Sequence, residues 1–440
     1  MGNYQAYEKY KDSGVKWLGD IPKHWKKSVF RYYFDIQLGK MLQNESQSEH
    51  DEEISYLKAI HVRWDKVNID DLPKMWTSPR EKEKYSVRNG DLLISEGGEV
   101  GRTALLKDLH EDCIIQNAVH RVRALSQSKV EYLNYLMRHI ADTKWLDILC
   151  NKSTIAHLTS EKLGALPLPL PPLDEQELIA NFLDRKTKQI DDLIAKKEAL
   201  LAKLDEKRSA IISHAVTKGL DPTVPMKDSG IEWLGDIPKH WEALKIKRLT
   251  AIKRGASPRP IDDPKYFDDD GEYSWVRIDD VTASERYLEN TTQRLSELGK
   301  SFSVPLEPDK LFLSIAGSVG KPMITKIKCC IHDGFVYFPD LKISKELIYY
   351  IFYSGQPYLG LGKLGTQLNL NTETVGAITI GLPPLDKQDA IIKYLDKKTV
   401  EINLQKAKVQ EAIERLKEYR TALITNAVTG KIDVRQVSLN

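Results

Sequence analysis

The sequence predicts an α+β protein with a pseudo-twofold internal repeat, in which two mixed α/β domains alternate with two long coiled-coil helices. The repeat shows first in a short marker, because KDSGVKWLGDIPKHW at residues 11–25 returns as KDSGIEWLGDIPKHW at residues 227–241, with 13 of 15 positions identical. The helices show in two segments, residues 171–221 and 383–433, which align without a gap. The domains show between these landmarks, where short apolar runs alternate with glycines, as in strands and turns.

The chain is long enough for two or more domains, with 440 residues of which 41% are apolar and 29% charged. Its net charge is only +2, so a nucleic-acid partner would have to meet basic residues gathered on one face. The opening MGNYQAYEKYKDSG has no apolar core, and no later run could span a bilayer, so we expect a cytoplasmic protein with no membrane partner. The cysteines show no zinc spacing and are expected to be free thiols: Cys113, Cys150, Cys329 and Cys330.

Each long segment is predicted to be one helix that begins at a Pro-Pro pair, because proline lacks a donor that the first helical turn leaves unused. Asp174 and Asp386 are the predicted N-caps. About 40 residues at 1.5 Å each give a helix about 60 Å long. Apolar residues spaced as in a coiled-coil seam are Leu183, Ile190, Ile194, Leu201, Leu204, Ile211, Leu395, Ile402, Ile413, Leu416 and Leu423. The alternative is a pair of solvated surface helices, but two helices of equal length can bury each other.

The two globular stretches share a skeleton although their sequences differ. ISYLKAIHV aligns with YSWVRIDDV, GDLLISEGGEVGR with DKLFLSIAGSVGK, and CIIQNAV with CCIHDGF. Helices are predicted at residues 130–148 and 345–354. The predicted layout is a marker at 1–25, a domain at 26–170, a long helix at 171–221, a linker with the second marker at 222–241, a domain at 242–382, and a long helix with the C-terminal tail at 383–440.

No catalytic or cofactor motif is complete. AGSVGK at residues 316–321 lacks the earlier glycine and the hydroxyl residue of a phosphate-binding loop, so we expect a strand-to-strand turn there. The Pro-Pro pairs lack the flanking residues of a base-methyltransferase loop, and no nucleophile elbow or zinc helix is present. IDDPKYFDDD at 261–270 leaves a paired-carboxylate nuclease site open, although an acidic solvated loop is the better interpretation. His24 and His240 are assigned to packing or hydrogen bonding. The sequence therefore favours a binding scaffold.

These features together resemble the DNA-specificity subunit of type I restriction–modification systems over nearly the whole chain. The LPPLDEQ and LPPLDKQ helix starts, the WLGDIPKHW markers and the GDLLIS segment carry the resemblance. It implies two target-recognition domains joined by two long antiparallel coiled-coil helices, which act as a spacer, and no activity of the chain alone. It implies no cofactor in this chain, with S-adenosylmethionine, ATP and Mg in partner subunits. The implied partners are double-stranded DNA, two copies of a modification subunit, and restriction subunits that translocate DNA.

In such a subunit, phosphate contacts position the protein, and polar side chains read base edges, with Arg at guanine and Asn or Gln at adenine. The first domain's candidates are His61, Arg63, Arg80, Arg102, Gln116 and Asn117. The second domain's candidates are Arg254, Ser257, Arg259, Arg277, Lys321, Lys363 and Gln367. The segments after Gly39 and Gly255 resemble the family's early recognition loop. The first of them lacks the Ser257-Pro258 pair of the second, so contacts do not transfer between the domains.

Two different domains on one pair of helices predict an asymmetric bipartite site, with half-sites separated by unread base pairs. Two other classes of function stay open. One is a coiled-coil protein–protein adaptor without DNA specificity, and the other is a self-contained DNA-modifying enzyme. A chimeric or phase-variable member of the same family would have the same sequence features.

Overall fold

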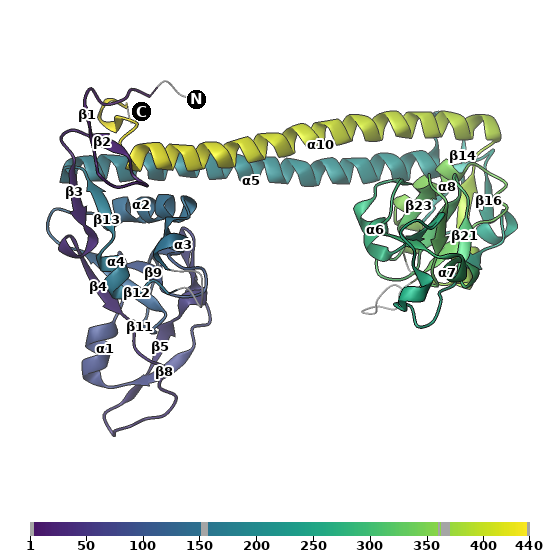
Figure 1. The fold of residues 1–440 in the computed structure, drawn as a ribbon. Helices are drawn as coiled ribbons and strands as arrows, with labels where there is room; N and C mark the ends of the chain where they lie inside the picture. Colours follow the sequence, from purple (N-terminus) through teal and green to yellow (C-terminus); the bar gives the residue numbers. More distant parts are fainter. Residues whose placement is uncertain (1–3, 151–156, 360, 362–369, 438–440) are drawn as a thin grey trace. The chain divides into compact units, whose positions relative to one another are not determined.

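The structure, a computed structural model, describes residues 4–150, 157–359, 361 and 370–437 (Figure 1). The chain forms two compact units, which we call unit 1 (residues 1–197 with 410–440) and unit 2 (residues 198–409). Two long helices, α5 (Leu173–Lys218) and α10 (Leu385–Val428), each pass from one unit into the other. The predicted layout gave each long helix a segment of its own. In the division into two units, each helix has one part of its residues in unit 1 and the other part in unit 2.

Unit 1 contains the first marker and the first domain. Its elements before α5 are β1 (Tyr10–Asp12), β2 (Asp20–Pro22), β3 (Lys26–Val29), β4 (Phe34–Leu38), β5 (Glu52–Leu57), β6 (Val62–Arg63), β7 (Lys66–Val67), β8 (Lys74–Thr77), α1 (Pro79–Tyr85), β9 (Leu92–Ser95), β10 (Thr103–Leu105), β11 (Cys113–Ile115), β12 (Val119–Ala124), α2 (Val130–Asp142), α3 (Trp145–Leu149), α4 (Ser160–Gly164) and β13 (Pro167–Leu170). One sheet has the order β10-β9-β12-β4, and another has the order β11-β5-β8. Apolar residues of β9, β12 and α2 share one core, so the larger sheet packs against α2.

Unit 2 repeats this plan with the second marker and the second domain. Its elements are β14 (Met226–Asp228), β15 (Asp236–Pro238), β16 (Glu242–Lys245), β17 (Lys253–Arg254), β18 (Tyr273–Val276), α6 (Ile278–Ala283), β19 (Tyr287–Leu288), β20 (Gln293–Leu295), α7 (Glu297–Ser301), β21 (Val304–Leu306), β22 (Leu311–Ser314), β23 (Pro322–Thr325), β24 (Cys329–Ile331), β25 (Phe335–Tyr337), α8 (Lys345–Tyr353), α9 (Thr372–Ala377) and β26 (Thr379–Leu382). Its sheets have the orders β17-β25-β22-β23-β19 and β20-β18-β24-β21. Strand β24 lies parallel to β18 as β11 lies parallel to β5, so the aligned segments of the two domains occupy equivalent strands.

The structure differs from the prediction for the helix at residues 130–148 and confirms the turn predicted at residues 316–321. The helix expected at 130–148 is two helices, α2 and α3, because Lys144 between them has a left-handed φ of 56°. The AGSVGK segment is confirmed as a strand-to-strand turn, since it joins the antiparallel strands β22 and β23. Gly317 and Gly320 have φ values of 66° and 85° there, a region that favours glycine.

The predicted N-caps of the long helices are wrong by two residues. Helix α5 begins at Leu173 and helix α10 at Leu385, so Asp174 and Asp386 lie inside the first turn. The first backbone hydrogen bond of α5 joins the Gln176 N–H to the carbonyl of the preceding proline, at 2.9 Å. Both aspartates instead place a negative charge beside the positive end of the helix dipole, which favours the helix start.

Within each unit the two long helices run antiparallel and cover each other's apolar side. In unit 1, Arg420 on α10 donates to Asp191 on α5, with Nε 3.0 Å from Oδ1. In unit 2, Lys406 on α10 lies 2.6 Å from the Asp205 carboxylate on α5. Predicted seam residues that are buried are Leu183, Ile190, Leu204, Leu395, Ile402, Ile413 and Leu423, while Ile194, Leu201, Ile211 and Leu416 are half-buried. The predicted α+β fold class, with two mixed domains and two long antiparallel helices, is confirmed.

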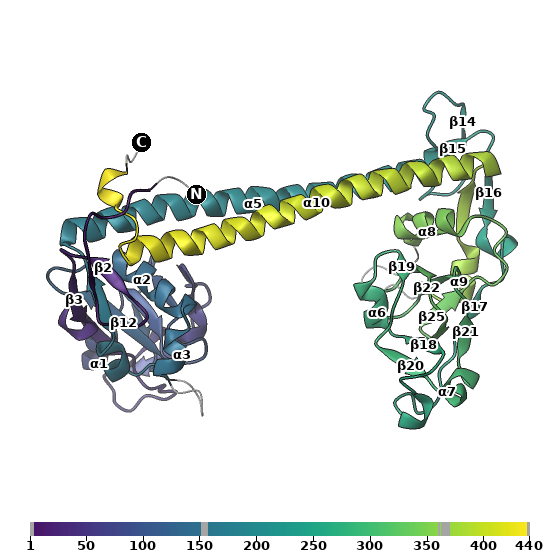
Figure 2. The ribbon, with the colours of Figure 1, turned by 45° about the horizontal axis from the view of Figure 1, so that its top comes forward.

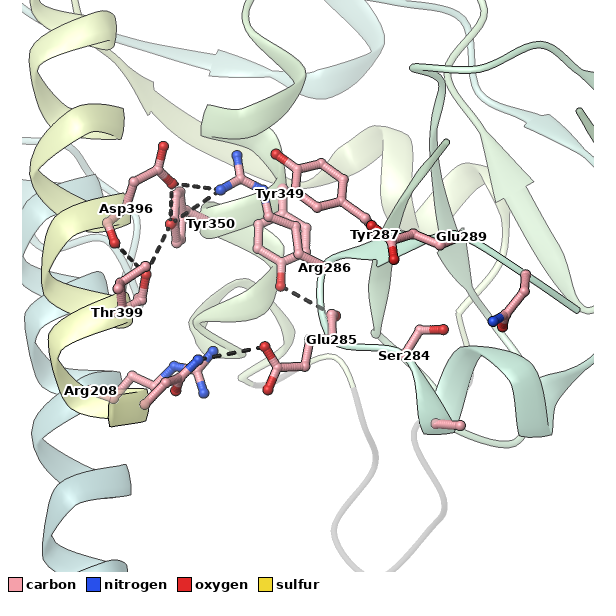
Figure 3. Close-up of a pocket in the computed structure, with 14 residues that line it drawn as sticks. Arg208, Ser284, Glu285, Arg286, Tyr287, Glu289, Tyr349, Tyr350, Asp396 and Thr399 are labelled. Atoms are coloured by element: carbon pink, nitrogen blue, oxygen red, sulfur yellow. Dashed lines mark hydrogen bonds and ion pairs between the residues drawn. The ribbon is translucent and has the colours of Figure 1, made fainter. Parts of the chain in front are cut away.

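Each domain is attached to a long helix through the same set of hydrogen bonds. In unit 1 the Tyr135 hydroxyl donates to Asp184 Oδ1 at 2.6 Å and lies 3.3 Å from Thr187 Oγ1. In unit 2 the Tyr350 hydroxyl lies 2.6 Å from Asp396 and 3.4 Å from Thr399 (Figure 3). These buried bonds fix the helices α2 and α8 against α5 and α10, respectively. Leaving such a polar group unpaired would cost about 1–3 kcal/mol.

The first marker closes one end of unit 1, where its strand β2 lies beside the C-terminal end of α10 (Figure 2). The side chain of Trp25 is fully buried, and its indole N–H donates to Glu175 Oε1 at 2.9 Å. The backbone N–H of Asp433 donates to the Gln5 carbonyl at 2.8 Å, so the two terminal segments touch each other. Among the described residues, no helix is long and apolar enough to cross a membrane.

A buried histidine makes the stability of unit 1 depend on pH. His139 on α2 is 4% exposed, and its Nδ1 lies 3.1 Å from Thr425 Oγ1 on α10. Burial lowers the pKa of His139 from 6.5 to about 4, so the ring is neutral when folded and takes a proton on unfolding. The unfolded chain therefore binds the extra proton between pH 6.5 and 4, and stability falls as the pH falls through this window.

When the pH is lowered from 7 to 5, we expect the unfolding free energy of the wild type to fall by about 2 kcal/mol more than that of His139→Asn. Urea titrations at the two pH values measure this difference. The control is His110→Asn, which makes the same substitution at an exposed histidine and is measured at the same two pH values. An equal pH dependence in wild type and His139→Asn would contradict the assignment.

Candidate nucleic-acid interface

The loop after Gly39, which we call loop 1 (residues 40–51), starts against the turn that holds two candidate residues. The Lys40 N–H donates to the Ile115 carbonyl, and the Asn117 N–H donates to the Lys40 carbonyl, both at 2.8 Å. A Cβ on Gly39 would lie 2.3 Å from the Gln116 carbonyl oxygen, so only glycine permits this approach. Loop 1 is therefore fixed beside Gln116 and Asn117.

Loop 1 is organised mainly by acidic and amide side chains. Lys40 Nζ donates to Gln43 Oε1 and to Glu81 Oε1, both at 2.8 Å. The Asp51 carboxylate accepts from the backbone N–H of Gln47 at 2.8 Å and from the Ser48 hydroxyl at 2.9 Å. The Gln47 bond is the main reason that the pKa of Asp51 is lowered. The loop therefore presents carboxylates and amides, and its single lysine is already paired.

The equivalent loop of the second domain, loop 2 (residues 256–262), follows Gly255 and has a different chemistry. A Cβ on Gly255 would lie 2.1 Å from the His332 carbonyl oxygen, which repeats the constraint at Gly39. Ser257 Oγ donates to Asp333 Oδ1, and Arg259 Nη2 donates to Asp333 Oδ2, both at 2.8 Å. Arg254 Nε donates to the Asp333 carbonyl at 2.5 Å. Three of the candidate DNA-contact residues of the second domain, Arg254, Ser257 and Arg259, thus hydrogen-bond to the same residue, Asp333.

Asp333 was not among the predicted site residues, although the alignment contained a signal for it. CIIQNAV aligned with CCIHDGF places Asp333 opposite Asn117, which was a candidate. Partial burial opposes ionisation of Asp333, but the Ser257 hydrogen bond and the Arg259 charge lower its pKa. The carboxylate is therefore ionised at neutral pH and holds Ser257 and Arg259 of loop 2 in place.

Arg102 and Lys321 were predicted to contact DNA, and in the structure both donate to backbone carbonyls of their own domain. Arg102 is 9% exposed, and its Nη2 donates to the Ala59 carbonyl at 2.8 Å. Lys321 Nζ donates to the carbonyls of Thr282 and Ser284, at 3.1 and 2.7 Å. Arg102 and Lys321 occupy aligned positions. Arg102 holds the short turn at Ala59 that follows β5, and Lys321 holds the end of α6, which follows β18.

The other candidate DNA-contact residues differ in how much of the side chain is exposed. His61 is 9% exposed, and its Nδ1 accepts from the Lys58 N–H at 3.2 Å. Burial, followed by the charges of Lys58 and Arg63, lowers the pKa of His61. Side chains of Gln116, Ser257 and Arg277 are half-buried, whereas Arg63, Arg80, Asn117, Arg254 and Arg259 are exposed. Lys363 and Gln367 lie outside the described residues.

A cleft of about 630 Å³ in unit 2 lies where α8 and residues 283–290 meet the long helices (Figure 3). Arg286 lies at its centre, with Nη1 2.5 Å from Asp396 and Cζ 5.1 Å from the ring centroid of Tyr349. In the described part of the chain, no three His, Cys, Asp or Glu side chains are grouped to hold a metal ion. The paired charges make this cleft part of the attachment between domain and helices.

The two domains are related scaffolds that carry different loops. Comparison with known proteins shows the family to which the chain belongs. A family model described as the type I restriction modification DNA specificity domain matches residues 62–203 and 238–415. The chain belongs to this family. Each of the two matched ranges of the specificity subunit covers most of one domain and much of a long helix.

Two relatives extend the similarity over most of the chain. The specificity subunit of the type I restriction enzyme MjaVIII from Methanocaldococcus jannaschii is 28% identical over 458 residues, covering 98% of each chain. The EcoBI specificity subunit from Escherichia coli is 23% identical, covering 80% of this chain and 75% of its own. The HsdS subunit from Thermoanaerobacter tengcongensis has a crystal structure that superposes with a TM-score of 0.55 at 16% identity, over 94% of this chain and 98% of that one. This structural likeness supports the fold.

We expect Gly39→Ala and Gly255→Ala each to destabilise the specificity subunit by about 1–3 kcal/mol, because the added Cβ would overlap a backbone carbonyl. Denaturant unfolding measures the change. The control is Gly97→Ala, whose Cβ would meet nothing closer than the His157 side chain at 4.0 Å. We expect that control to change stability by no more than about 0.5 kcal/mol. Equal effects at all three positions would contradict the close approach.

Proposed function

We propose that this chain is the sequence-specific DNA-binding subunit of a type I restriction–modification complex, in which each domain recognises one half of an asymmetric bipartite site. The observation that carries the proposal is that two equivalent loops are fixed by the same glycine constraint but present different side chains. Loop 1 carries Glu45, Glu49 and Asp51, whereas Lys253 and Arg254 precede loop 2, which carries Arg259. Such a difference supports two half-sites of different sequence.

Exposed side chains beside these loops are the proposed base or phosphate contacts. Arg254 and Arg259 extend from a site ordered by Asp333, and arginine pairs well with guanine edges and phosphates. Asn117 is exposed beside loop 1, and an amide pairs well with adenine. Arg102 is better explained as a support for the segment at Ala59, and Lys321 as a support for the end of α6, than as DNA contacts.

The long helices are proposed to set the spacing of the half-sites and to bind two copies of the methyltransferase subunit. Support comes from their continuity, since α5 spans 46 residues and α10 spans 44 residues without a break. In this proposal the chain contributes no catalysis. S-adenosylmethionine, ATP and Mg belong to the modification and restriction subunits.

Two rival functions make different predictions for the isolated chain. A protein–protein adaptor would show no salt-dependent affinity for DNA, whereas phosphate contacts predict a steep loss of affinity with salt. A self-contained enzyme would modify or cut DNA when given S-adenosylmethionine or Mg without a partner. Binding assays over a salt series, with turnover assays beside them, therefore separate the three functions.

We expect Asn117→Ala to relax recognition at one half-site and Arg254→Ala with Arg259→Ala to relax recognition at the other. Losing a good base contact costs about 1–3 kcal/mol of discrimination against the wrong base. Methylation mapping of DNA treated with the reconstituted complex measures each half-site separately. Arg415→Ala is the control, because Arg415 is exposed on α10 and pairs with Glu411 of the same helix. The two-half-site assignment fails if both sets of variants relax the same half-site.

A second experiment shortens both long helices together. Deleting residues 195–201 and 410–416 together removes seven residues from each long helix, and the two deletions match in the numbering of the Asp191–Arg420 and Asp205–Lys406 pairs. Removing both shortens each helix by seven residues, or about 10 Å, which equals about three base pairs of DNA. We expect a recognition site with both half-sites unchanged and a spacer about three base pairs shorter, measured by methylation mapping.

Removing only residues 195–201 is the matched control for this experiment. The helices would then differ in length, and we expect assembly or DNA binding to be lost. A matched double deletion that methylates the original spacer would show that the helices do not set the spacing.

A further inference from the structure

The two halves of the chain differ in chemistry at the start of the long helices. In unit 1, Glu175 on the first turn of α5 is 2% exposed, and three donors from the N-terminal region surround its carboxylate. These donors are Tyr7 Oη, His24 Nε2 at 2.8 Å and Trp25 Nε1 at 2.9 Å. A buried carboxylate requires such partners, so these three side chains seal this end of unit 1.

Unit 2 keeps the marker but not the carboxylate. LPPLDEQ aligned with LPPLDKQ places Lys387 at the position of Glu175. His240 and Trp241 keep the positions of His24 and Trp25. YEKYKDSG aligned with TVPMKDSG puts Thr223 in place of Tyr7, so the side chain that covers the site in unit 1 is missing.

An open pocket of about 310 Å³ occupies this place in unit 2. Its walls include Val224, Pro238, Trp241, Lys387, Ala390 and Ile391. Several of these residues are the aligned counterparts of residues around Tyr7 and Glu175 in unit 1. Because the pocket corresponds to a filled site, we attribute it to the loss of the tyrosine and the carboxylate.

The polar groups of this pocket favour an incoming carboxylate. Trp241 is 2% exposed, and within the described residues its indole N–H has no acceptor, whereas that of Trp25 donates to Glu175. Lys387 is 61% exposed, and its ammonium lies 3.7 Å from the adjacent Asp386. The Asp221 carboxylate also lines the pocket, but it accepts from the Thr223 N–H at 2.9 Å and from the Thr223 hydroxyl at 2.6 Å. The pocket therefore offers a cation and a free N–H donor beside apolar walls.

We propose that this pocket binds an acidic side chain of the modification subunit, whose carboxylate takes the place that Glu175 holds in unit 1. The Lys387 ammonium would pair with the carboxylate, and the Trp241 N–H would donate to it, while Val224, Pro238 and Ile391 cover its apolar neighbours. A polypeptide is the favoured source, because side chains fill the same place in unit 1. The identity of this partner rests on the proposed function, whereas the preference for a carboxylate does not.

The carboxylate preference is tested on the full chain alone with 3-phenylpropionate, which joins a carboxylate to a ring of suitable size. We expect saturable binding in ligand-observed NMR, and a loss of affinity of about tenfold or more in Lys387→Glu, because the charge pair becomes a repulsion. The matched control is Lys393→Glu, which makes the same charge change at an exposed position of α10 and should bind as wild type does. The uncharged 3-phenylpropanol should bind more weakly than the acid. Equal binding of acid and alcohol, or of wild type and Lys387→Glu, would overturn the carboxylate site.

The partner is tested by native mass spectrometry of the chain with its modification subunit. We expect Lys387→Glu to lose one of two modification subunits at concentrations where wild type and Lys393→Glu hold both. If 3-phenylpropionate binds as expected but Lys387→Glu assembles fully, the modification subunit is not the occupant. If the wild-type chain assembles with no modification subunit at all, the proposed function fails instead, and the small-molecule result still decides the carboxylate site.

Discussion

The structure depends on one constraint, which is that neither long helix can bury its apolar side alone. In unit 1, residues of α5 and α10 such as Leu183 and Leu423 belong to the same apolar core as Trp25 and Tyr132. Marker, domain and helix ends therefore form one packed body, in which no part can leave without exposing apolar surface. Buried hydrogen bonds make the arrangement specific, because Tyr132 also donates to the carbonyl of Val428 at 3.1 Å. This rigidity is what allows short loops to be presented in a defined position.

The repeat keeps these supports and changes what they present. Tyr135 and Tyr350 make equivalent bonds to the long helices, and Gly39 and Gly255 permit equivalent close approaches. The loops that follow the glycines differ in charge and in hydrogen-bonding groups, since loop 1 has an excess of carboxylates whereas loop 2 balances Arg259 with Asp262. A scaffold of this kind can exchange its loops without losing stability, because the bonds that hold the domain lie elsewhere. Different loops on equivalent supports are therefore the pattern expected of two domains that recognise different sequences.

The sequence predicts those features of the fold that depend on local residue patterns or on the alignment of the two halves of the chain with each other. The repeat, the long helices and the strand-to-strand turn at 316–321 all follow from it. Asp333 as an organiser of loop 2 does not, because its partners lie more than 70 residues away in the chain. The same holds for Tyr7 and Glu175, which are 168 residues apart and meet only when the marker folds onto α5. The helix starts were misplaced because Asp174 could serve equally well as a cap or in the first turn.

The difference between Glu175 and Lys387 follows from building a twofold repeat with a linear chain. In unit 2 the end of α5 runs directly into the second marker, so a covalent link joins them. In unit 1 the end of α10 and the first marker lie more than 400 residues apart in the chain, so no short link joins them. Contacts replace the link, since Tyr10 donates to the Gly430 carbonyl at 2.9 Å and Lys431 donates to the Asp20 carbonyl at 2.7 Å. Tyr7 on Glu175 adds a buried anchor at this end of unit 1, whereas in unit 2 the covalent link already holds α5 to the second marker. The linked copy could therefore lose both groups without unfolding, which leaves its pocket open to a partner.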